Sequence, residues 1–137
     1  MLPGSLATAV THLVQTFQEA TGLPVHITLP DELPLLPEAH RLVLYRAAQE
    51  SLTNVQRHAN AQQAWLTLEA NEAQVTLIVA DDGQGFQDEV ADGRFGLVGL
   101  HERTKQLDGV LLLGQAEQGG AQLRLQLPIP HVEAVDA

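Results

Sequence analysis

The sequence predicts an α+β fold: a two-layer α/β sandwich in which a mixed, mostly antiparallel sheet carries about three helices on one face. The first observation is the order of the expected elements, which is helix, strand, helix, two strands, helix, two strands. The second is that the strands of each later pair are joined by short connections, which antiparallel neighbours permit. A chain of 137 residues is close to the commonest domain size, so residues 1–137 are expected to form a single domain.

The first half of the chain contains two expected helices and one short strand. The stretch "LATAVTHLVQTFQEATG" has five apolar side chains at helical spacing, namely Leu6, Val10, Leu13, Val14 and Phe17. Gly22 then suits the end of this helix. "PVHITLP" alternates Val25, Ile27 and Leu29 as a strand does, and the two prolines of "DELPLLP" indicate a loop. A long helix is expected over residues 38–59.

The second half predicts four strands and one helix. "AWLTLEA" and "QVTLIVA" are expected to pair through a tight connection at Asn71 and Glu72. The glycine-rich residues 81–96 show no apolar periodicity, and "LVGLHERTKQLDG" then predicts a helix that ends at Gly109. "VLLLGQA" and "AQLRLQLP" are expected to form a hairpin around "EQGG". The ordered core is therefore expected over about residues 5–129, with residues 130–137 as a tail.

Composition excludes several classes of function. The chain has 17 acidic residues against 7 Lys and Arg, a formal net charge of -10, and no cluster of Lys or Arg. This argues against a nucleic-acid partner and against direct membrane contact. The absence of cysteine removes disulfides and thiolate metal sites, and no apolar run approaches the length of a membrane span. A cytoplasmic location is expected, and any bound anion must be met by a few placed donors or a metal ion.

The long helix has a chemically unusual face. At the angular spacing of an α-helix, Leu44, Tyr45, Ala48, Leu52, Val55 and Ala59 share the side expected to pack on the sheet. Glu50, Asn54, Arg57 and His58 share the opposite side. A solvated helix face with helpful i,i+4 pairs would explain this stripe equally well. Asparagine within a helix favours a functional reading, however, because it is a mediocre helix former.

Two glycine-rich segments add the remaining groups of a nucleotide pocket. In "DDGQGF", Asp81 ends a predicted strand, where its carboxylate can accept hydrogen bonds from a flat amino-bearing ring. The glycines that follow let the backbone approach such a ring without a Cβ in the way. In "GRFGLVGL", Gly96 and Gly99 open a helix, and free N–H groups at a helix start can bind phosphate. Neither a Walker P-loop nor a Rossmann fingerprint is present.

Four segments in order carry a resemblance to a known family. "QESLTNVQRHA", "VADDGQGF", "FGLVGLHER" and "GGAQLRLQLPI" resemble the N box, G1 box, G2 box and closing strands of the catalytic domain of sensor histidine kinases. That domain has the Bergerat (GHKL) ATPase fold, shared with type II topoisomerases and mismatch-repair ATPases. The nitrate/nitrite-sensor type is the most similar variant, because "YRxxQExLTNxxRHA" and "GLxG[ML]xER" recur in it. The resemblance covers residues 6–129.

The resemblance implies ATP and Mg²⁺ as ligands and assigns roles on the long helix. Asn54 would coordinate Mg²⁺ that bridges the ATP phosphates, a hard-cation role suited to an amide oxygen. Glu50 would orient a metal-bound water or act as base for the attacking imidazole. Arg57 would lie near the phosphates. His58 belongs to the same motif, although a capping or packing role fits it as well.

The resemblance also assigns roles in the glycine-rich segments. Asp81 would accept from the adenine amino group, and Gly83 and Gly85 would admit the ring. Asp82 would support the loop or reach the pocket through water. Gly96 and Gly99 would hinge a lid and present N–H groups to phosphate. Leu97 and Leu100 would pack toward the base or the core.

Two departures from the family pattern bear on function. Ala121 stands where the family usually has Thr after the glycine pair of the last hairpin, which is expected to weaken nucleotide binding slightly. The phosphoacceptor segment of this branch resembles "HDxxxQ", and none of the six histidines precedes an aspartate. The dimerisation and phosphoacceptor domain is therefore expected to be absent. The five histidines outside the N box are expected to be ordinary surface residues without a zinc spacing.

The resemblance therefore implies a protein-histidine kinase catalytic domain that cannot phosphorylate itself at the usual site. It would bind Mg-ATP and transfer the γ-phosphate to a histidine on a separate dimerisation domain, for relay to a response regulator. Two alternatives stay open. One is a protein-serine kinase of the anti-sigma type, and the other is a non-catalytic nucleotide-binding module of the same fold.

Overall fold

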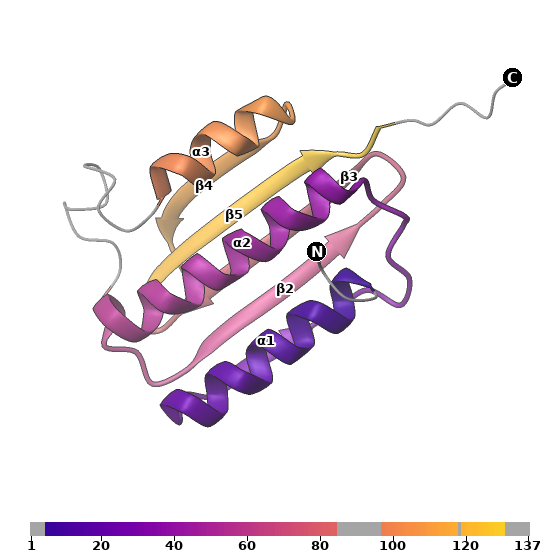
Figure 1. The fold of residues 1–137 in the computed structure, drawn as a ribbon. Helices are drawn as coiled ribbons and strands as arrows, with labels where there is room; N and C mark the ends of the chain where they lie inside the picture. Colours follow the sequence, from indigo (N-terminus) through magenta and orange to yellow (C-terminus); the bar gives the residue numbers. More distant parts are fainter. Residues whose placement is uncertain (1–4, 85–96, 118, 131–137) are drawn as a thin grey trace, which may run out of the picture.

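A computed structural model describes residues 5–84, 97–117 and 119–130. Within these residues the chain forms one five-stranded sheet and three α-helices, and the helices lie on one face of the sheet (Figure 1). The elements are α1 (Leu6–Thr21), β1 (Val25–Thr28), α2 (Glu38–Asn54), the π-helix η1 (Val55–Ala59), β2 (Ala64–Ala70), β3 (Gln74–Asp81), α3 (Leu97–Gln106), β4 (Val110–Gln115) and β5 (Ala121–Pro128). The predicted two-layer α+β architecture is confirmed.

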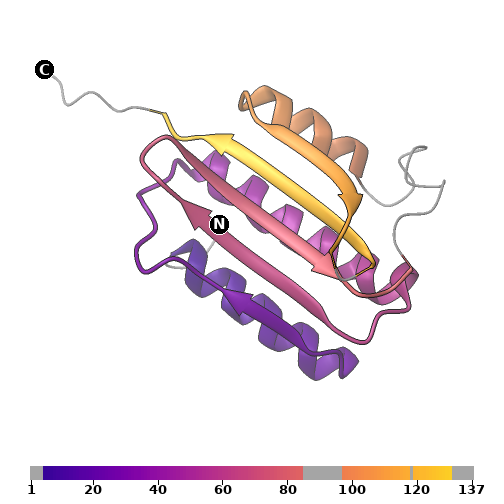
Figure 2. The same ribbon diagram turned by 180° about the vertical axis from the view of Figure 1, so that it is seen from behind.

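The sheet is mixed and mostly antiparallel, with the strand order β1-β2-β3-β5-β4. Only β1 and β2 run parallel among the described pairs, with Val25 opposite Ala64. The other pairs, β2 with β3, β3 with β5 and β4 with β5, are antiparallel. Seen from behind, the sheet lies in front of all three helices (Figure 2). The late strand β5 is therefore inserted between β3 and β4, which brings the end of β3 against the start of β5.

Helix α1 begins and ends where its sequence predicts. The Ser5 hydroxyl accepts a hydrogen bond from the Thr8 N–H at 3.1 Å, which caps the helix start. Gly22 takes a left-handed conformation with φ 75°, and its N–H donates to the Gln18 carbonyl. Leu6, Ala9, Val10 and Val14 are buried, so the apolar stripe of this helix belongs to the core.

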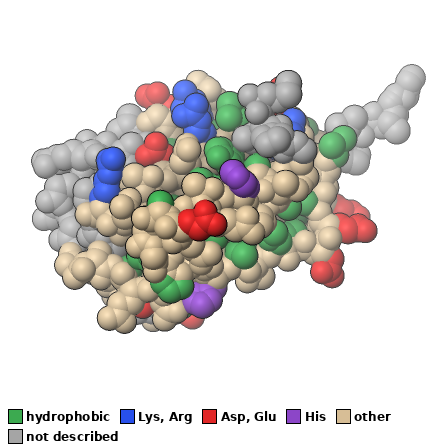
Figure 3. All heavy atoms as spheres, turned by 60° about the horizontal axis from the view of Figure 1, so that its bottom comes forward, with side chains coloured by type: hydrophobic (Ala, Val, Ile, Leu, Met, Phe, Trp, Pro, Cys, Tyr) green, Lys and Arg blue, Asp and Glu red, His purple; other side chains and the backbone are tan. Residues whose placement is uncertain are grey.

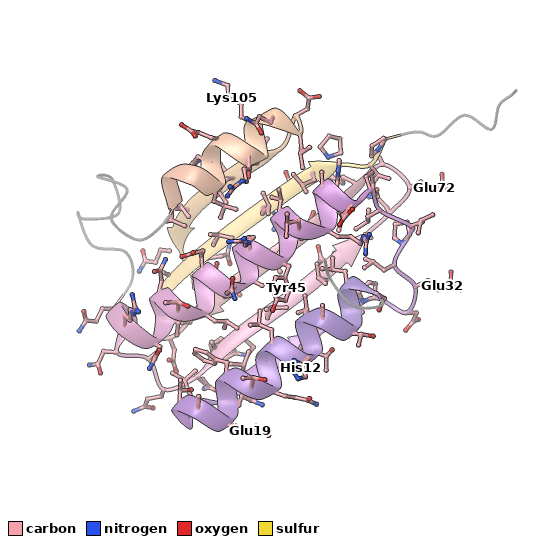
Figure 4. All side chains as sticks on the ribbon, in the orientation of Figure 1. His12, Glu19, Glu32, Tyr45, Glu72 and Lys105 are labelled. Carbon is pink, nitrogen blue, oxygen red and sulfur yellow. The ribbon has the colours of Figure 1, made fainter. Side chains whose placement is uncertain are left out.

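Helix α2 covers the middle of the sheet and has the predicted buried side. Leu44, Ala48, Leu52 and Val55 are each at most 5% exposed, and Tyr45 packs against the core between α2 and α1 (Figure 4). The prediction of one α-helix over residues 38–59 is wrong at its end, because the α-helix stops at Asn54 and continues as the π-helix η1. Asn60 then ends the helical run in a left-handed conformation.

The turns that connect the strands match their predicted positions. The Asn71 side chain accepts from the N–H groups of Ala73 and Gln74, at 2.7 and 2.8 Å, which builds the tight β2–β3 connection. After α3, Asp108 takes the left-handed conformation, and Gly109 donates to the Thr104 carbonyl. A Cβ on Gly109 would lie 2.5 Å from Leu127, so glycine is required there by close approach.

The expectation of ordinary surface histidines is wrong for His40. This side chain is 5% exposed, and its Nε2 lies 2.9 Å from the Pro128 carbonyl oxygen, which joins the start of α2 to the end of β5. A carbonyl only accepts, so Nε2 carries the proton. His12, His26 and His101 are exposed as expected, and His131 lies outside the described residues.

Figure 3 shows how the Lys and Arg side chains are distributed over one face of the molecule. On the face that Figure 3 presents, Lys and Arg side chains lie apart from one another. Within the described residues, no helix is both long enough and apolar enough to cross a membrane.

Candidate functional site

Asp81 is the centre of the candidate site. It is the last residue of β3 and is 2% exposed. Its Oδ1 accepts hydrogen bonds from the N–H groups of Gly83, at 2.8 Å, and Ala121, at 3.3 Å. Burial raises the pKa of Asp81 and outweighs the two hydrogen bonds, which lower it, while the nearby charge of Asp82 raises it further. The structure thus holds one buried carboxylate in a defined orientation at the end of a central strand.

Gly120 makes this arrangement possible, although the sequence reasoning did not single it out as a site residue. A Cβ at Gly120 would collide with Oδ1 and the carbonyl oxygen of Asp81, and would lie 2.6 Å from the Gly83 nitrogen. Only glycine therefore fits between β5 and the Asp81 turn. The available signal was the pair of glycines directly before the last strand.

Ala121 also lies at the site, through its backbone. Its N–H is one of the two donors to Asp81, and the residue is 9% exposed. The position at which this chain departs from the family pattern is therefore in direct contact with the central carboxylate. The hydrogen bond to Asp81 does not depend on the missing hydroxyl, because the backbone makes it.

Asp82 faces a different segment from Asp81. Its Oδ1 accepts from the N–H groups of Gln62 and Gln63, at 2.9 and 3.1 Å. Desolvation raises the pKa of Asp82, but hydrogen bonds from Gln63, Gln62 and its own backbone outweigh this effect, so that its pKa is lowered. Of the two predicted roles for Asp82, support of the loop agrees with these contacts.

The end of α2 supplies the polar groups predicted for the phosphates and metal. Glu50 and Asn54 are half-buried and lie one turn apart, and Arg57 is exposed on η1. From Val55 the chain continues as a π-helix, whose wider turn differs from the α-helical spacing on which the predicted stripe was based. The backbone of His58 lies in η1, and its side chain is outside the described residues.

Helix α3 begins at the same end of the sheet as η1 ends (Figure 1). Leu97 and Leu100 are 1% and 4% exposed and belong to the hydrophobic core, so the core alternative of their prediction holds. Gly99 is exposed, and the Arg103 guanidinium lies 3.9 Å from where a Cβ of Gly99 would stand. Gly85 and Gly96 lie outside the described residues.

The described donors suit magnesium held jointly with a nucleotide. Among the residues the structure places, no group of three or more His, Cys, Asp or Glu could hold a metal ion. Mg²⁺ bound with nucleotide phosphates needs only one or two protein oxygens, since phosphates and waters complete its shell. The Glu50 carboxylate and the Asn54 amide, one turn apart on α2, are donors of this kind.

Comparison with known proteins identifies a family and a similar fold. Residues 39–131 match the family described as "Histidine kinase-, DNA gyrase B-, and HSP90-like ATPase". The signal transduction histidine-protein kinase/phosphatase DegS of Brevibacillus brevis is 34% identical over 121 residues, which cover 88% of this chain and 31% of that protein. The blue-light activated histidine kinase of Erythrobacter litoralis has a similar fold, with a TM-score of 0.75 at 16% identity over 90% of this chain and 42% of that one.

The comparison does not single out the nitrate/nitrite type of kinase. The nitrate/nitrite sensor protein NarX of Escherichia coli is 26% identical over 122 residues, covering 88% of this chain and 20% of that protein. The identity to DegS is higher. The chain thus spans less than a third of the length of both curated relatives.

Proposed function

The chain belongs to the histidine kinase-, DNA gyrase B- and HSP90-like ATPase family, and on that premise we propose that it binds Mg-ATP and transfers the γ-phosphate to a histidine of a separate dimerisation domain. The observation that carries the proposal is the oriented, buried Asp81 carboxylate, held by Gly83 and Ala121. The end of α2, with Glu50 and Asn54, would supply the phosphate side of the same site. The curated relatives are named as sensor histidine kinases, which supports histidine as the acceptor.

The base side of the proposed site recognises adenine through Asp81. A carboxylate is an acceptor only, so it pairs with an exocyclic amino group and rejects a ring that presents a carbonyl at that position. Gly83 and Gly85 would leave room for the ring beside it. The two backbone N–H groups on Oδ1 keep the carboxylate from rotating away from the base.

The phosphate side positions the reacting groups. Asn54 and Glu50 would hold magnesium, directly and through water, and the bound ion would neutralise charge on the phosphates. Arg57, His58 and the N–H groups near Gly96 and Gly99 would contact phosphate oxygens. Leu97 and Leu100 anchor the start of α3 in the core, which keeps this end of the helix in place. Catalysis would rest on positioning and charge neutralisation, as phosphoryl transfer generally demands.

The phosphate would pass from the histidine to an aspartate of a response regulator. That histidine would belong to a dimerisation domain of the same full-length kinase, because none of the histidines here precedes an aspartate as in the family's acceptor segment. A cytoplasmic location and the nitrate/nitrite-sensor subtype remain expectations.

Mixing this domain with a histidine-bearing dimerisation domain and labelled Mg-ATP tests the proposal. We expect binding with a Kd on the order of micromolar to millimolar, and acid-labile phosphate on the added domain. Asn54→Ala should abolish the transfer, whereas Gln56→Ala, which removes an exposed amide on the adjacent η1, should leave it intact. Normal transfer by Asn54→Ala would refute the metal-ligand role. Acid-stable phosphate would favour a serine kinase, and binding without any transfer would favour a regulatory module.

A further inference from the structure

Asp82 joins two segments that carry opposite sides of the proposed site. Its carboxylate accepts from Gln62 and Gln63, and its own N–H lies 3.4 Å from the Gln63 carbonyl oxygen. Residues 60–63 are the connection between η1 and β2. Asp82 directly follows Asp81. Asp81 contacts the start of β5, and Asp82 contacts the loop after η1.

The loop over residues 60–63 connects η1 to β2, so its path determines how η1 is placed relative to the sheet. Asn60 turns the chain in a left-handed conformation, and β2 begins at Ala64, opposite Asp81. Without the Asp82 carboxylate, the Gln62 and Gln63 N–H groups would lose the acceptor that draws this loop against β3. The connection from the end of α2 to the sheet would then be held less firmly against Asp81.

We propose that Asp82 is a positioning residue that fixes the loop over residues 60–63, and with it η1 and the Asn54 end of α2, relative to Asp81. The inference rests on the proposed function, because its consequence is the distance between the base side and the phosphate side of one nucleotide. Asp82 acts through the loop backbone and need not touch the nucleotide.

A further set of contacts anchors the loop to the edge of the sheet. The Gln63 side-chain Oε1 lies 2.8 Å from His26 Nε2 on β1. The His26 ring stacks on Trp65 of β2, with ring centroids 5.6 Å apart. The hydrogen bonds to Asp82 favour its ionised form, since they outweigh desolvation and lower its pKa. Asp82 is therefore a charged acceptor at neutral pH, which makes its hydrogen bonds the stronger kind.

Three substitutions at one position separate positioning from general stabilisation. Asp82→Ala removes the acceptor, Asp82→Asn keeps an acceptor oxygen of the same shape, and Asp82→Glu keeps the charge but displaces it by one methylene. Asp31→Ala is the matched control, because it removes an exposed loop carboxylate. Calorimetry with Mg-ATP and with adenosine reports the whole site and its base side separately. Amide hydrogen exchange at Gln62 and Gln63 reports the loop without any nucleotide.

We expect Asp82→Ala to raise the Kd for Mg-ATP about tenfold or more, as the loss of charged hydrogen bonds would. Its Kd for adenosine should change less than about threefold, and exchange at Gln62 and Gln63 should accelerate about tenfold or more. Asp82→Asn should fall between the parent and Asp82→Ala in all three measurements, because its oxygen can accept both bonds but lacks the charge that strengthens them. Asp82→Glu should bind Mg-ATP weakly, and this holds as a test even if Asp82→Ala does not fold.

Equal Mg-ATP affinity in the parent, Asp82→Ala and Asp82→Glu would overturn the inference. Mg-ATP binding by Asp82→Asn no tighter than by Asp82→Ala would also overturn it, because a correctly placed acceptor oxygen would then have no effect. Failure of the folded parent to bind any adenine nucleotide would instead overturn the proposed function. In that case, unchanged amide hydrogen exchange at Gln62 and Gln63 in Asp82→Ala would still refute the claim that Asp82 fixes the loop over residues 60–63.

Discussion

Asp81 and Asp82 are neighbours in sequence, yet their pKa values are displaced in opposite directions. Asp81 is buried, and desolvation raises its pKa despite two backbone donors. For Asp82 the hydrogen-bond donors lower the pKa by more than desolvation raises it. Two carboxylates with such different surroundings have different tasks. Asp82 is held as an ion by its hydrogen bonds, whereas burial of Asp81 disfavours its charged form.

The signs of these shifts predict opposite effects on stability. The raised pKa of Asp81 means that its contribution is fully favourable below the unfolded value of 3.8 and is lost as pH rises through the folded pKa. The lowered pKa of Asp82 means that its contribution is present above 3.8 and is lost as pH falls through the folded pKa. Above its folded pKa the buried Asp81 carboxylate therefore costs the unliganded domain stability.

Asp81→Asn should consequently leave the unliganded domain at pH 7 at least as stable as the parent, because the neutral amide can still accept from Gly83 and Ala121. The same variant should lose about tenfold or more in ATP affinity, since its amide cannot reproduce a charged acceptor. Chemical denaturation and calorimetry with ATP and GTP measure the two effects. Equal discrimination between ATP and GTP in parent and variant would show that Asp81 does not read the base.

Individual site residues were predictable where chemistry alone marks them. Asp81 and Asp82 could be found because two acids and two glycines follow an apolar strand, a poor choice for a core. Gly120 and His40 could not be found in this way. Their roles depend on close approaches to Asp81 and Pro128, and these approaches exist only once β5 pairs with β3 and α2 covers the sheet.

Among the elements, the β4–β5 hairpin has a role that its turn sequence does not reveal. Gly119 has φ 103° and opens the turn, whereas Gly120 packs directly on the Asp81 turn. The hairpin is therefore part of the wall of the site as well as a connection between two strands.

Gly120→Ala should destabilise the domain by about 1–3 kcal/mol, because its Cβ would collide with backbone atoms that cannot move aside freely. Gly114→Ala is the matched control, since a Cβ at Gly114 of β4 would meet nothing within 4 Å. We expect the control to stay within about 0.5 kcal/mol of the parent. The midpoint of denaturant unfolding measures both variants. A stable Gly120→Ala domain with parental nucleotide affinity would contradict the packing argument.

Element boundaries were predictable where a cap marks them and uncertain where tertiary contacts decide. Ser5, Gly22 and Asn71 each bring their own hydrogen bonds or backbone preference, so α1 and the β2–β3 turn match their predicted places. The change from α2 to η1 carries no such local signal. Nothing in "TNVQRHA" distinguishes a π-turn from the α-helical continuation that its periodicity predicts.

At the scale of the whole molecule, one core connects all three helices with the sheet. Leu6, Leu44 and Leu97 come from the three helices, and Leu125 comes from the interior strand β5. Each of them is at most 1% exposed. The fold class followed from the order of elements and their periodicity. The strand order did not follow, because the hydrophobic pattern is compatible with several topologies and does not tell that β3 and β5 are neighbours.

A shared core predicts that nucleotide binding stabilises the entire domain. At a free Mg-ATP concentration of 100 times Kd, the free energy of unfolding should rise by about 2.7 kcal/mol, because only the folded chain has the site. Thermal or denaturant unfolding with and without Mg-ATP measures this increase, and Asp81→Ala serves as the control that loses it. A parent domain whose unfolding is indifferent to saturating Mg-ATP would contradict a site built into the native fold.

The bond from the Ala121 N–H to Asp81 joins residues 40 positions apart, and it forms only when β5 has entered the sheet. During translation the Asp81 end of β3 leaves the ribosome well before β5, the strand that supplies the Ala121 donor. While β5 is still inside the ribosome, the nascent chain lacks the Ala121 donor that holds the Asp81 carboxylate in place. For the proposed site, nucleotide binding is therefore expected only after β5 has emerged and paired with β3.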